Sequence, residues 1–179
     1  LAGLFGLAAG ASPPSRFYTL DAVAEAVPGA RTSTTIVVGQ VSLPPRVDRR
    51  QWVLGTGRVT VAEFDRWAAP LREEIGRALA LNLSRVLGAS QVAAWPQNLI
   101  ADPDVQVFVD FGRFESEPGV VARAEVGWQL RDRHGKTLAS GHQTYESRPA
   151  DAQLTSLSTA HNRNLAALAA EIAAALRAL

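Results

Sequence analysis

Hydrophobic and polar residues alternate along two segments in the second half of the chain. Apolar side chains recur at every second position from Val105 to Phe111 and again from Val120 to Leu130. A further β-prone segment, Thr137–Glu146, follows the turn-like sequence Asp132–Lys136. A period of two is typical of strands with one buried and one solvated face. The pattern therefore predicts three consecutive antiparallel strands.

Two other segments carry apolar residues at steps of three and four, which indicates amphipathic helices. The first helix is predicted to start near Ala69, because Pro70 is tolerated only in a first turn, and to end at Gly88. Phe64–Trp67 is predicted to form a separate short turn before it. The second helix follows Pro149–Asp151, and its apolar face consists of Leu154, Leu157, His161, Leu165, Leu168, Ile172 and Leu176.

The first half of the chain contains shorter β-prone segments. They are Phe17–Leu20, then Thr35–Leu43 up to Pro44-Pro45, and a pair, Gln51–Leu54 and Arg58–Val61, that flanks a Gly-Thr-Gly turn. Segments 21–34 and 96–104 are predicted loops. The elements together predict a single α+β domain over residues 16–179. Its sheet is expected to be largely antiparallel or mixed, with two long helices packed on one face.

The start of the chain has a different character. Residues 1–11 are uncharged and largely apolar, and Ser12-Pro13-Pro14-Ser15 follows. The apolar stretch is shorter than the roughly 20 residues that span a membrane, and it resembles the hydrophobic part of an export signal. The alternative is an N-terminal core helix, which the Ser-Pro-Pro sequence would stop.

The sequence Leu7–Ser12 is similar to the end of a bacterial lipoprotein signal from which the lipidated cysteine is missing. Gly10 stands where that cysteine is expected; a register that places Ala11 there fits less well. We therefore predict that residues 1–15 comprise a residual signal region, a vacant lipidation position at Gly10 and a short tether.

Composition excludes several classes of function. The formal net charge is +1, so no basic excess favours nucleic acid as a partner. The chain has no cysteine, which excludes disulfides, thiolate metal sites and a cysteine nucleophile. It also has no methionine, which indicates a processed or engineered form.

No catalytic or metal-binding pattern is present in the sequence. His134, His142 and His161 do not stand at metal-ligand spacing, and His161 is expected to be a hydrogen-bonded core residue. No nucleophile motif or phosphate-binding glycine loop occurs. Glu63 and Asp65 are interpreted as favouring the start of the first helix electrostatically. We predict no cofactor, no metal and no enzymatic activity.

One middle region combines paired prolines, arginines and tryptophans, which are residues that anchor protein–protein contacts. Its alternative role is structural, with the aromatic side chains in the core and the Arg–Asp pairs as local contacts. The candidate interface residues are Pro44, Pro45, Arg46, Asp48, Arg49, Trp52, Glu63, Phe64, Asp65, Arg66 and Trp67.

At these residues the chain resembles the PqiC family, the ABC-type transport auxiliary lipoproteins of Gram-negative bacteria. The similarity begins at Ser12–Leu20, continues through Val41–Arg49 with Gln51–Val53, and is strongest at Ala62–Leu71 and Leu81–Leu83. Trp95-Pro96 and the final helix also fit, so the resemblance spans essentially the whole chain. The departure from the family pattern is Gly10 in place of the lipidated cysteine.

The resemblance implies a non-enzymatic lipoprotein that faces the periplasm and is anchored in the outer membrane through an N-terminal lipid in the parent protein. It further implies a role in an MCE-type lipid transport system, with an MCE-domain protein similar to PqiB as partner. Homo-oligomerisation, in the form of a ring, is also expected. The rival hypothesis is a periplasmic lipid chaperone that holds an acyl chain in an apolar cavity between the sheet and the helices.

Overall fold

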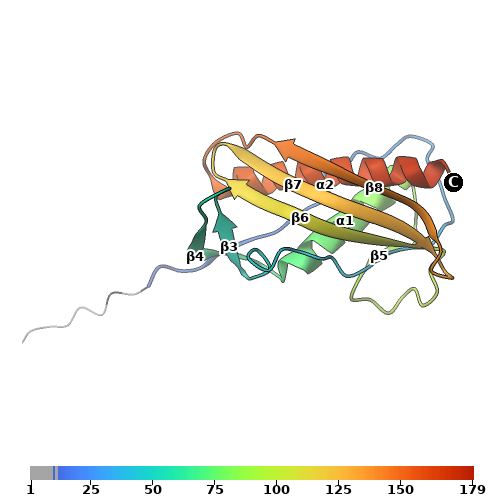
Figure 1. The fold of residues 1–179 in the computed structure, drawn as a ribbon, viewed down its shortest axis with the longest axis horizontal. Coiled ribbons are helices and arrows are strands. Elements are labelled where there is room, and N and C mark those ends of the chain that lie inside the picture. The colour runs from blue at the N-terminus through green and yellow to red at the C-terminus, as the bar shows by residue number, and fades with distance from the viewer. Residues whose placement is uncertain (1–9, 11) are drawn as a thin grey trace, which may run out of the picture.

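The computed structural model describes residue 10 and residues 12–179, which form one α+β domain with two sheets and two helices (Figure 1). The predicted fold class is confirmed. The strands are β1 (Arg16–Tyr18), β2 (Ile36–Val38), β3 (Gln51–Leu54), β4 (Thr60–Trp67), β5 (Val92–Ala94), β6 (Val105–Glu117), β7 (Val121–Asp132) and β8 (Thr137–Ser147), and the helices are α1 (Leu71–Leu87) and α2 (Leu154–Arg177).

The larger sheet has five strands in the order β5-β2-β6-β7-β8. The strands β5, β2 and β6 are parallel, whereas β6, β7 and β8 form the antiparallel meander expected from the alternating pattern. Both helices cover the same face of this sheet: α1 packs on β2 and β5, and α2 packs on β7 and β8 (Figure 1). The core between the layers contains fully buried aliphatic side chains, among them Val38, Ile75, Leu79, Val107, Val126, Leu168 and Ile172.

A second, smaller sheet has three strands in the order β1-β4-β3 and lies at one end of the molecule (Figure 1). Its central strand corrects one prediction, because Phe64–Trp67 forms the end of β4 and not a turn. Asp65 and Trp67 point into the protein and alternate with the half-buried Phe64 and Arg66. Phe64 and Trp67 stand three residues apart, so their spacing fits a helical turn as well as it fits an irregular strand.

The predicted strand Thr35–Leu43 is regular only over Ile36–Val38. Beyond it, the amide of Gly39 bonds to the carbonyl of Val107 and that of Ser42 bonds to Val109. Three residues of the segment after β2 thus oppose two residues of β6, and the extra residue interrupts the ladder as in a bulge. The chain nevertheless follows β6, so the prediction was correct in path and too long in extent.

The helix α1 begins and ends close to the residues that the sequence predicted. Pro70 precedes the first helical residue, and Gly88 ends the helix in the left-handed conformation, with φ of +61°. A side chain at Gly88 would also lie 1.9 Å from the carbonyl oxygen of Ala30. The glycine is therefore required both by its backbone conformation and by the close approach of the loop before β2.

A short polar chain crosses the core where the two sheets meet. The Nε1 of Trp52 donates to the hydroxyl of Ser116 at 2.9 Å, and that hydroxyl lies 2.8 Å from the Nε2 of His161. The imidazole is fully buried and stacks on Phe114 with 4.0 Å between ring centroids. His161 is thus the hydrogen-bonded core residue that the helix pattern indicated, and burial lowers its pKa to about 3.

This burial predicts acid-sensitive stability. An unfolded histidine takes up a proton near pH 6.5, whereas His161 in the folded chain does so only near pH 3. Its contribution is complete above pH 6.5 and is lost as the pH falls from there towards 3. For His161→Phe, the decrease in free energy of unfolding between about pH 7.5 and about pH 4.5 should be smaller than for the parent by about 2–3 kcal/mol.

Denaturant unfolding at both pH values measures this difference. His134→Gln, in an exposed turn, is the control and should follow the parent chain. Equal pH dependence of His161→Phe and the parent would contradict the assignment.

Candidate functional site

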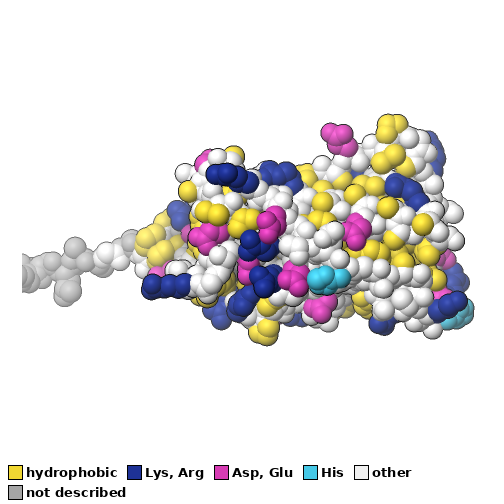
Figure 2. All heavy atoms as spheres, turned by 45° about the horizontal axis from the view of Figure 1, so that its top comes forward, with side chains coloured by type: hydrophobic (Ala, Val, Ile, Leu, Met, Phe, Trp, Pro, Cys, Tyr) yellow, Lys and Arg dark blue, Asp and Glu magenta, His cyan; other side chains and the backbone are white. Residues whose placement is uncertain are grey.

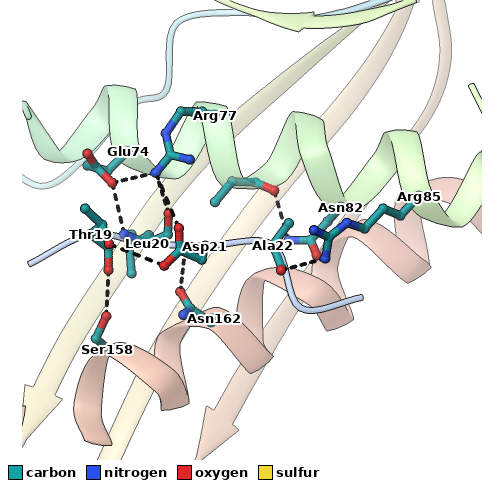
Figure 3. Close-up of polar contacts among 11 residues, drawn as sticks. Thr19, Leu20, Asp21, Ala22, Glu74, Arg77, Asn82, Arg85, Ser158 and Asn162 are labelled. Carbon is teal, nitrogen blue, oxygen red and sulfur yellow. Dashed lines mark hydrogen bonds and ion pairs between the residues drawn. The ribbon is translucent and has the colours of Figure 1, made fainter. Parts of the chain in front are cut away.

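The segment that follows β1 binds to the helices in an extended conformation. We call residues 19–24 the strap; it crosses between α1 and α2 and is contacted from both helices (Figure 3). Leu20 is completely buried in the core, whereas the flanking residues of the strap are partly or fully exposed. The strap has no regular secondary structure, so its main-chain groups need partners from elsewhere.

Side chains of α1 supply most of these partners. The amide of Leu20 donates to Glu74 Oε2 at 2.9 Å, and Arg77 donates to both the Leu20 carbonyl at 2.6 Å and Glu74 at 3.0 Å. The Oδ1 of the fully buried Asn82 accepts the amides of Val23 and Ala24 at 3.1 and 2.9 Å.

The contacts continue on both sides of the strap (Figure 3). Arg85 of α1 donates to the carbonyl of Ala22 at 2.7 Å. From α2, Ser158 donates to the Thr19 carbonyl at 2.7 Å, and Asn162 Oδ1 accepts the amide of Asp21 at 2.9 Å. Successive main-chain groups are therefore bonded by helix side chains, and the strap joins the two helices to each other.

A second attachment fixes β1 immediately before the strap. The guanidinium of Arg16 binds Asp65 of β4 through two hydrogen bonds of 2.7 and 2.9 Å, and the Tyr18 hydroxyl donates to the same carboxylate at 2.8 Å. The hydrogen bond from Arg16 lowers the pKa of Asp65, an effect that burial opposes and the hydrogen bond from Tyr18 supports. The side chain of Arg16 is 68% exposed. The ion pair therefore adds little to the free energy of unfolding, and its main effect is to fix the path of β1 along β4.

These attachments determine where the N-terminal segment leaves the folded body. Ser12–Ser15 and Gly10 are exposed, and Gly10 lies six residues before Arg16. Six extended residues reach at most about 20 Å. Whatever is attached at position 10 therefore stays close to the small sheet. The predicted residual signal in residues 1–9 lies outside the described residues, and the predicted lipid position at Gly10 stays a prediction.

The structure brings the two predicted interface segments together beside β1. Trp52 and Trp67 are 1% exposed and lie with their ring centroids 4.2 Å apart, and the ring of Tyr18 meets Trp52 edge-on at 5.1 Å. Asp65 is also buried, on Arg16 and Tyr18. The structural alternative thus describes these three candidates: they form the core of the small sheet.

The other candidates lie at or near the surface. Pro45, Arg46, Arg49 and Glu63 are exposed, and Pro44, Asp48, Phe64 and Arg66 are half-buried. Asp48 forms an ion pair with Arg72 of α1, and Arg46 lies 3.8 Å from Glu115. Their role in an interface stays a prediction.

Several cavities open on the surface of the described residues. One of about 480 Å³ lies at the end opposite the small sheet and is lined by Ile36, Leu87, Val105 and Leu176. Another of about 390 Å³ lies between α1 and β5, beside Leu81 and Trp95. Within residues 10 and 12–179, no three His, Asp or Glu side chains are placed to hold a metal ion. No helix in the same residues combines the length and apolar character needed to cross a bilayer.

Comparison with known proteins identifies the family. Residues 18–173 match the family described as ABC-type transport auxiliary lipoprotein component. The chain belongs to this family, which is the PqiC-like lipoprotein family that the sequence resembles. Membership of this family supports the role of a transport-associated lipoprotein. A search of curated proteins finds no match.

Solved structures share the fold at low sequence identity. A crystal structure from Xanthomonas campestris, of the DUF330 family, has 17% identity and a TM-score of 0.71, and the match covers 89% of this chain and 93% of that one. A second crystal structure, of an uncharacterized protein, has 18% identity and a TM-score of 0.72 over 92% and 99% of the two chains. A PelC dodecamer from Paraburkholderia phytofirmans is more distant, with 14% identity and a TM-score of 0.49 over 82% and 91%.

The strap contacts predict the effect of removing Asn82. In Asn82→Ala, the amides of Val23 and Ala24 lose their acceptor, and we expect the free energy of unfolding to fall by about 1–2 kcal/mol. Hydrogen exchange should accelerate at these two amides more than in β6. Asn98→Ala, in the exposed loop before β6, is the control. Unchanged exchange at Val23 and Ala24 would show that Asn82 does not hold the strap.

Proposed function

We propose that this chain is the non-enzymatic, periplasm-facing lipoprotein subunit of an MCE-type lipid transport system, held at the outer membrane by its N-terminus. Family membership supports a transport-associated lipoprotein. The observation that carries the finer proposal is the attachment of the N-terminal segment. The strap and the Arg16–Asp65 pair join the tether to the folded body through both helices and the small sheet. Such a domain suits a docking platform held at a defined place beside a membrane.

The proposed partner is an MCE-domain channel protein similar to PqiB, which the platform would receive at the outer membrane. The surface proposed to meet this partner, or the next subunit of a homo-oligomeric ring, is the loop before β3 with Pro45, Arg46 and Arg49, together with Glu63 of β4. These side chains are exposed, whereas Trp52 and Trp67 in the strands β3 and β4 are buried in the packed core of the small sheet. Rigid, exposed groups beside a packed core are favourable for binding because little conformational entropy is lost.

The lipid-chaperone alternative has less support from these residues. It places an acyl chain between the sheet and the helices, where Ala160, Ala169 and Ala173 of α2 are fully buried and the facing strand residue Val126 is buried as well. Small side chains on a helix allow it to lie close to the sheet. The apolar cavity of about 480 Å³ lies at the end of the two layers and opens to solvent.

The first test concerns the tether. When Gly10→Cys is expressed behind a complete lipoprotein signal, the protein should be recovered in the outer-membrane fraction and should gain the mass of a lipid. Gly10→Ser behind the same signal is the control and should stay soluble. A soluble, unmodified Gly10→Cys protein would contradict the lipid position at residue 10.

The second test concerns the partner surface. Arg49→Glu should reduce capture of the parent chain's MCE-type partner in detergent-free solution by about tenfold or more, the usual scale for reversing a charge at an interface. The melting temperature should change little because Arg49 is exposed. Arg31→Glu, exposed at the opposite end, is the matched control. Equal capture by the two variants would exclude the loop before β3 from the interface.

A further inference from the structure

The small sheet presents a row of residues to the solvent that neither the fold nor the proposed partner surface requires. In the registers of β1, β4 and β3, Phe17 pairs with Arg66, and Arg66 pairs with Gln51. Directly paired residues project from the same face of a sheet. The adjacent residues in the pleat, Tyr18 and Trp67, face the core, so the row of Phe17, Arg66 and Gln51 faces outward. We call it the outer row.

The chemistry of the outer row is aromatic and cationic. Phe17 is 60% exposed, which is unusual for a large aromatic side chain in a strand. Arg50, immediately before β3, accepts the Trp67 amide at its carbonyl and is exposed beside the row. Neither Arg50 nor Arg66 forms an ion pair in residues 10 and 12–179, and the Nε of Arg66 is buried without a hydrogen-bond partner there.

Within the part of the chain that the structure describes, no acidic side chain forms an ion pair with this row. The carboxylates of the small sheet are Glu63 and Asp65, and Asp65 lies on the opposite face, bound to Arg16 and Tyr18. Asp48, in the nearby loop, is bound to Arg72. Figure 2 shows several basic side chains around the end of the molecule from which the N-terminal segment leaves, with acidic side chains among them. Arg50 donates to the carbonyl of Ala68 at 3.2 Å, and neither Arg50 nor Arg66 is paired with a carboxylate in the described residues, so both keep their charge for a negatively charged partner.

The tether determines which partner meets this surface. Phe17 lies seven residues after Gly10, so a lipid at position 10 keeps the outer row within about 25 Å of the membrane. By contrast, α2 alone is about 36 Å long and extends towards the opposite end of the body. Because the strap prevents the body from moving away along the chain, the small sheet is the part of the domain nearest to the bilayer.

We propose that the outer row is a membrane-contact surface, in which Phe17 enters the interface between headgroups and acyl chains and Arg50 and Arg66 bind the phosphates of anionic phospholipids. An exposed aromatic group with flanking cations is the combination that binds such an interface, and guanidinium groups bind phosphate through paired N–H donors. This inference rests on the proposed tethering at position 10. A lipid anchor alone would attach the protein to the membrane. The outer row would in addition determine which face of the body is turned towards the membrane.

The test uses the 179-residue chain without a lipid and vesicles of phosphatidylethanolamine and phosphatidylglycerol, compared with vesicles of phosphatidylcholine. The parent chain should bind the anionic vesicles more tightly, and raising the salt concentration should weaken that binding. Phe17→Ser and Arg50→Glu should each reduce the partition coefficient on anionic vesicles about threefold to tenfold. All variants share residues 1–15, so any binding by that stretch is common to them.

Matched controls stand at the opposite end of the body. Leu99→Ser removes a more exposed apolar side chain, 93% exposed, and Arg31→Glu reverses an exposed charge; both should bind vesicles like the parent. Because the chain has no cysteine, Gln51→Cys can carry a single environment-sensitive fluorophore in the outer row, with Leu99→Cys as control. The emission should shift to the blue on anionic vesicles only for the label at position 51.

Two results would overturn the proposal. One is equal vesicle binding by Phe17→Ser and the parent, with a label at position 51 that stays in water. The other is self-association in light scattering that Phe17→Ser abolishes while vesicle binding stays unchanged, which would assign the outer row to a second copy of the chain. Because these measurements require neither lipidation nor the MCE-type partner, they fail or succeed independently of the tests of the proposed function.

Discussion

The arrangement of this domain depends on hydrogen bonds between side chains of the two helices and the main chain of the strap. An extended segment outside any sheet must find partners for its amides and carbonyls, or lose free energy for each group that is buried without one. Glu74, Asn82 and Asn162 supply acceptors for this purpose, and each is buried or nearly so. The strap in turn covers the seam between α1 and α2. The strap contacts and the separate Arg16–Asp65 pair together connect both helices, the small sheet and the N-terminal segment.

The two sheets have different cores. The larger sheet and its helices form an aliphatic core, whereas the small sheet is built around stacked tryptophans and the buried carboxylate of Asp65. The polar chain from Trp52 through Ser116 to His161 joins the two parts, because its members come from β3, β6 and α2. The small sheet is therefore joined to the larger sheet and to α2 by buried hydrogen bonds as well as by packing.

Periodicity was sufficient to predict β6, β7 and both helices, because each of these is long and has one buried face, and the turn Asp132–Lys136 indicated β8 as the partner of β7. It was insufficient for β4, where Phe64 and Trp67 are spaced as on a helix although they lie in a strand with an irregular register. The α1 residues that bind the strap, Glu74 and Asn82, were also missed. They border the apolar stripe of α1, and a polar residue there has the same appearance in a sequence whether it faces water or a buried main chain. Their partners lie more than 50 positions away. The sequence left open whether the candidate interface residues belong to a partner surface or to the core, and the structure separates the buried Trp52 and Trp67 from the exposed Arg49.

The attachment of β1 and the strap has a consequence for association rates and affinities. A lipid anchor on a flexible chain confines a protein to a layer beside the membrane but leaves the body free to rotate. Here main-chain and side-chain bonds hold the chain from Arg16 onward. Rotational freedom that is already restricted before binding is not lost again when a partner arrives. In the proposed lipid-anchored protein, the strap would limit the orientations of the body in advance and so raise the effective concentration at which a membrane-bound partner meets the correct face.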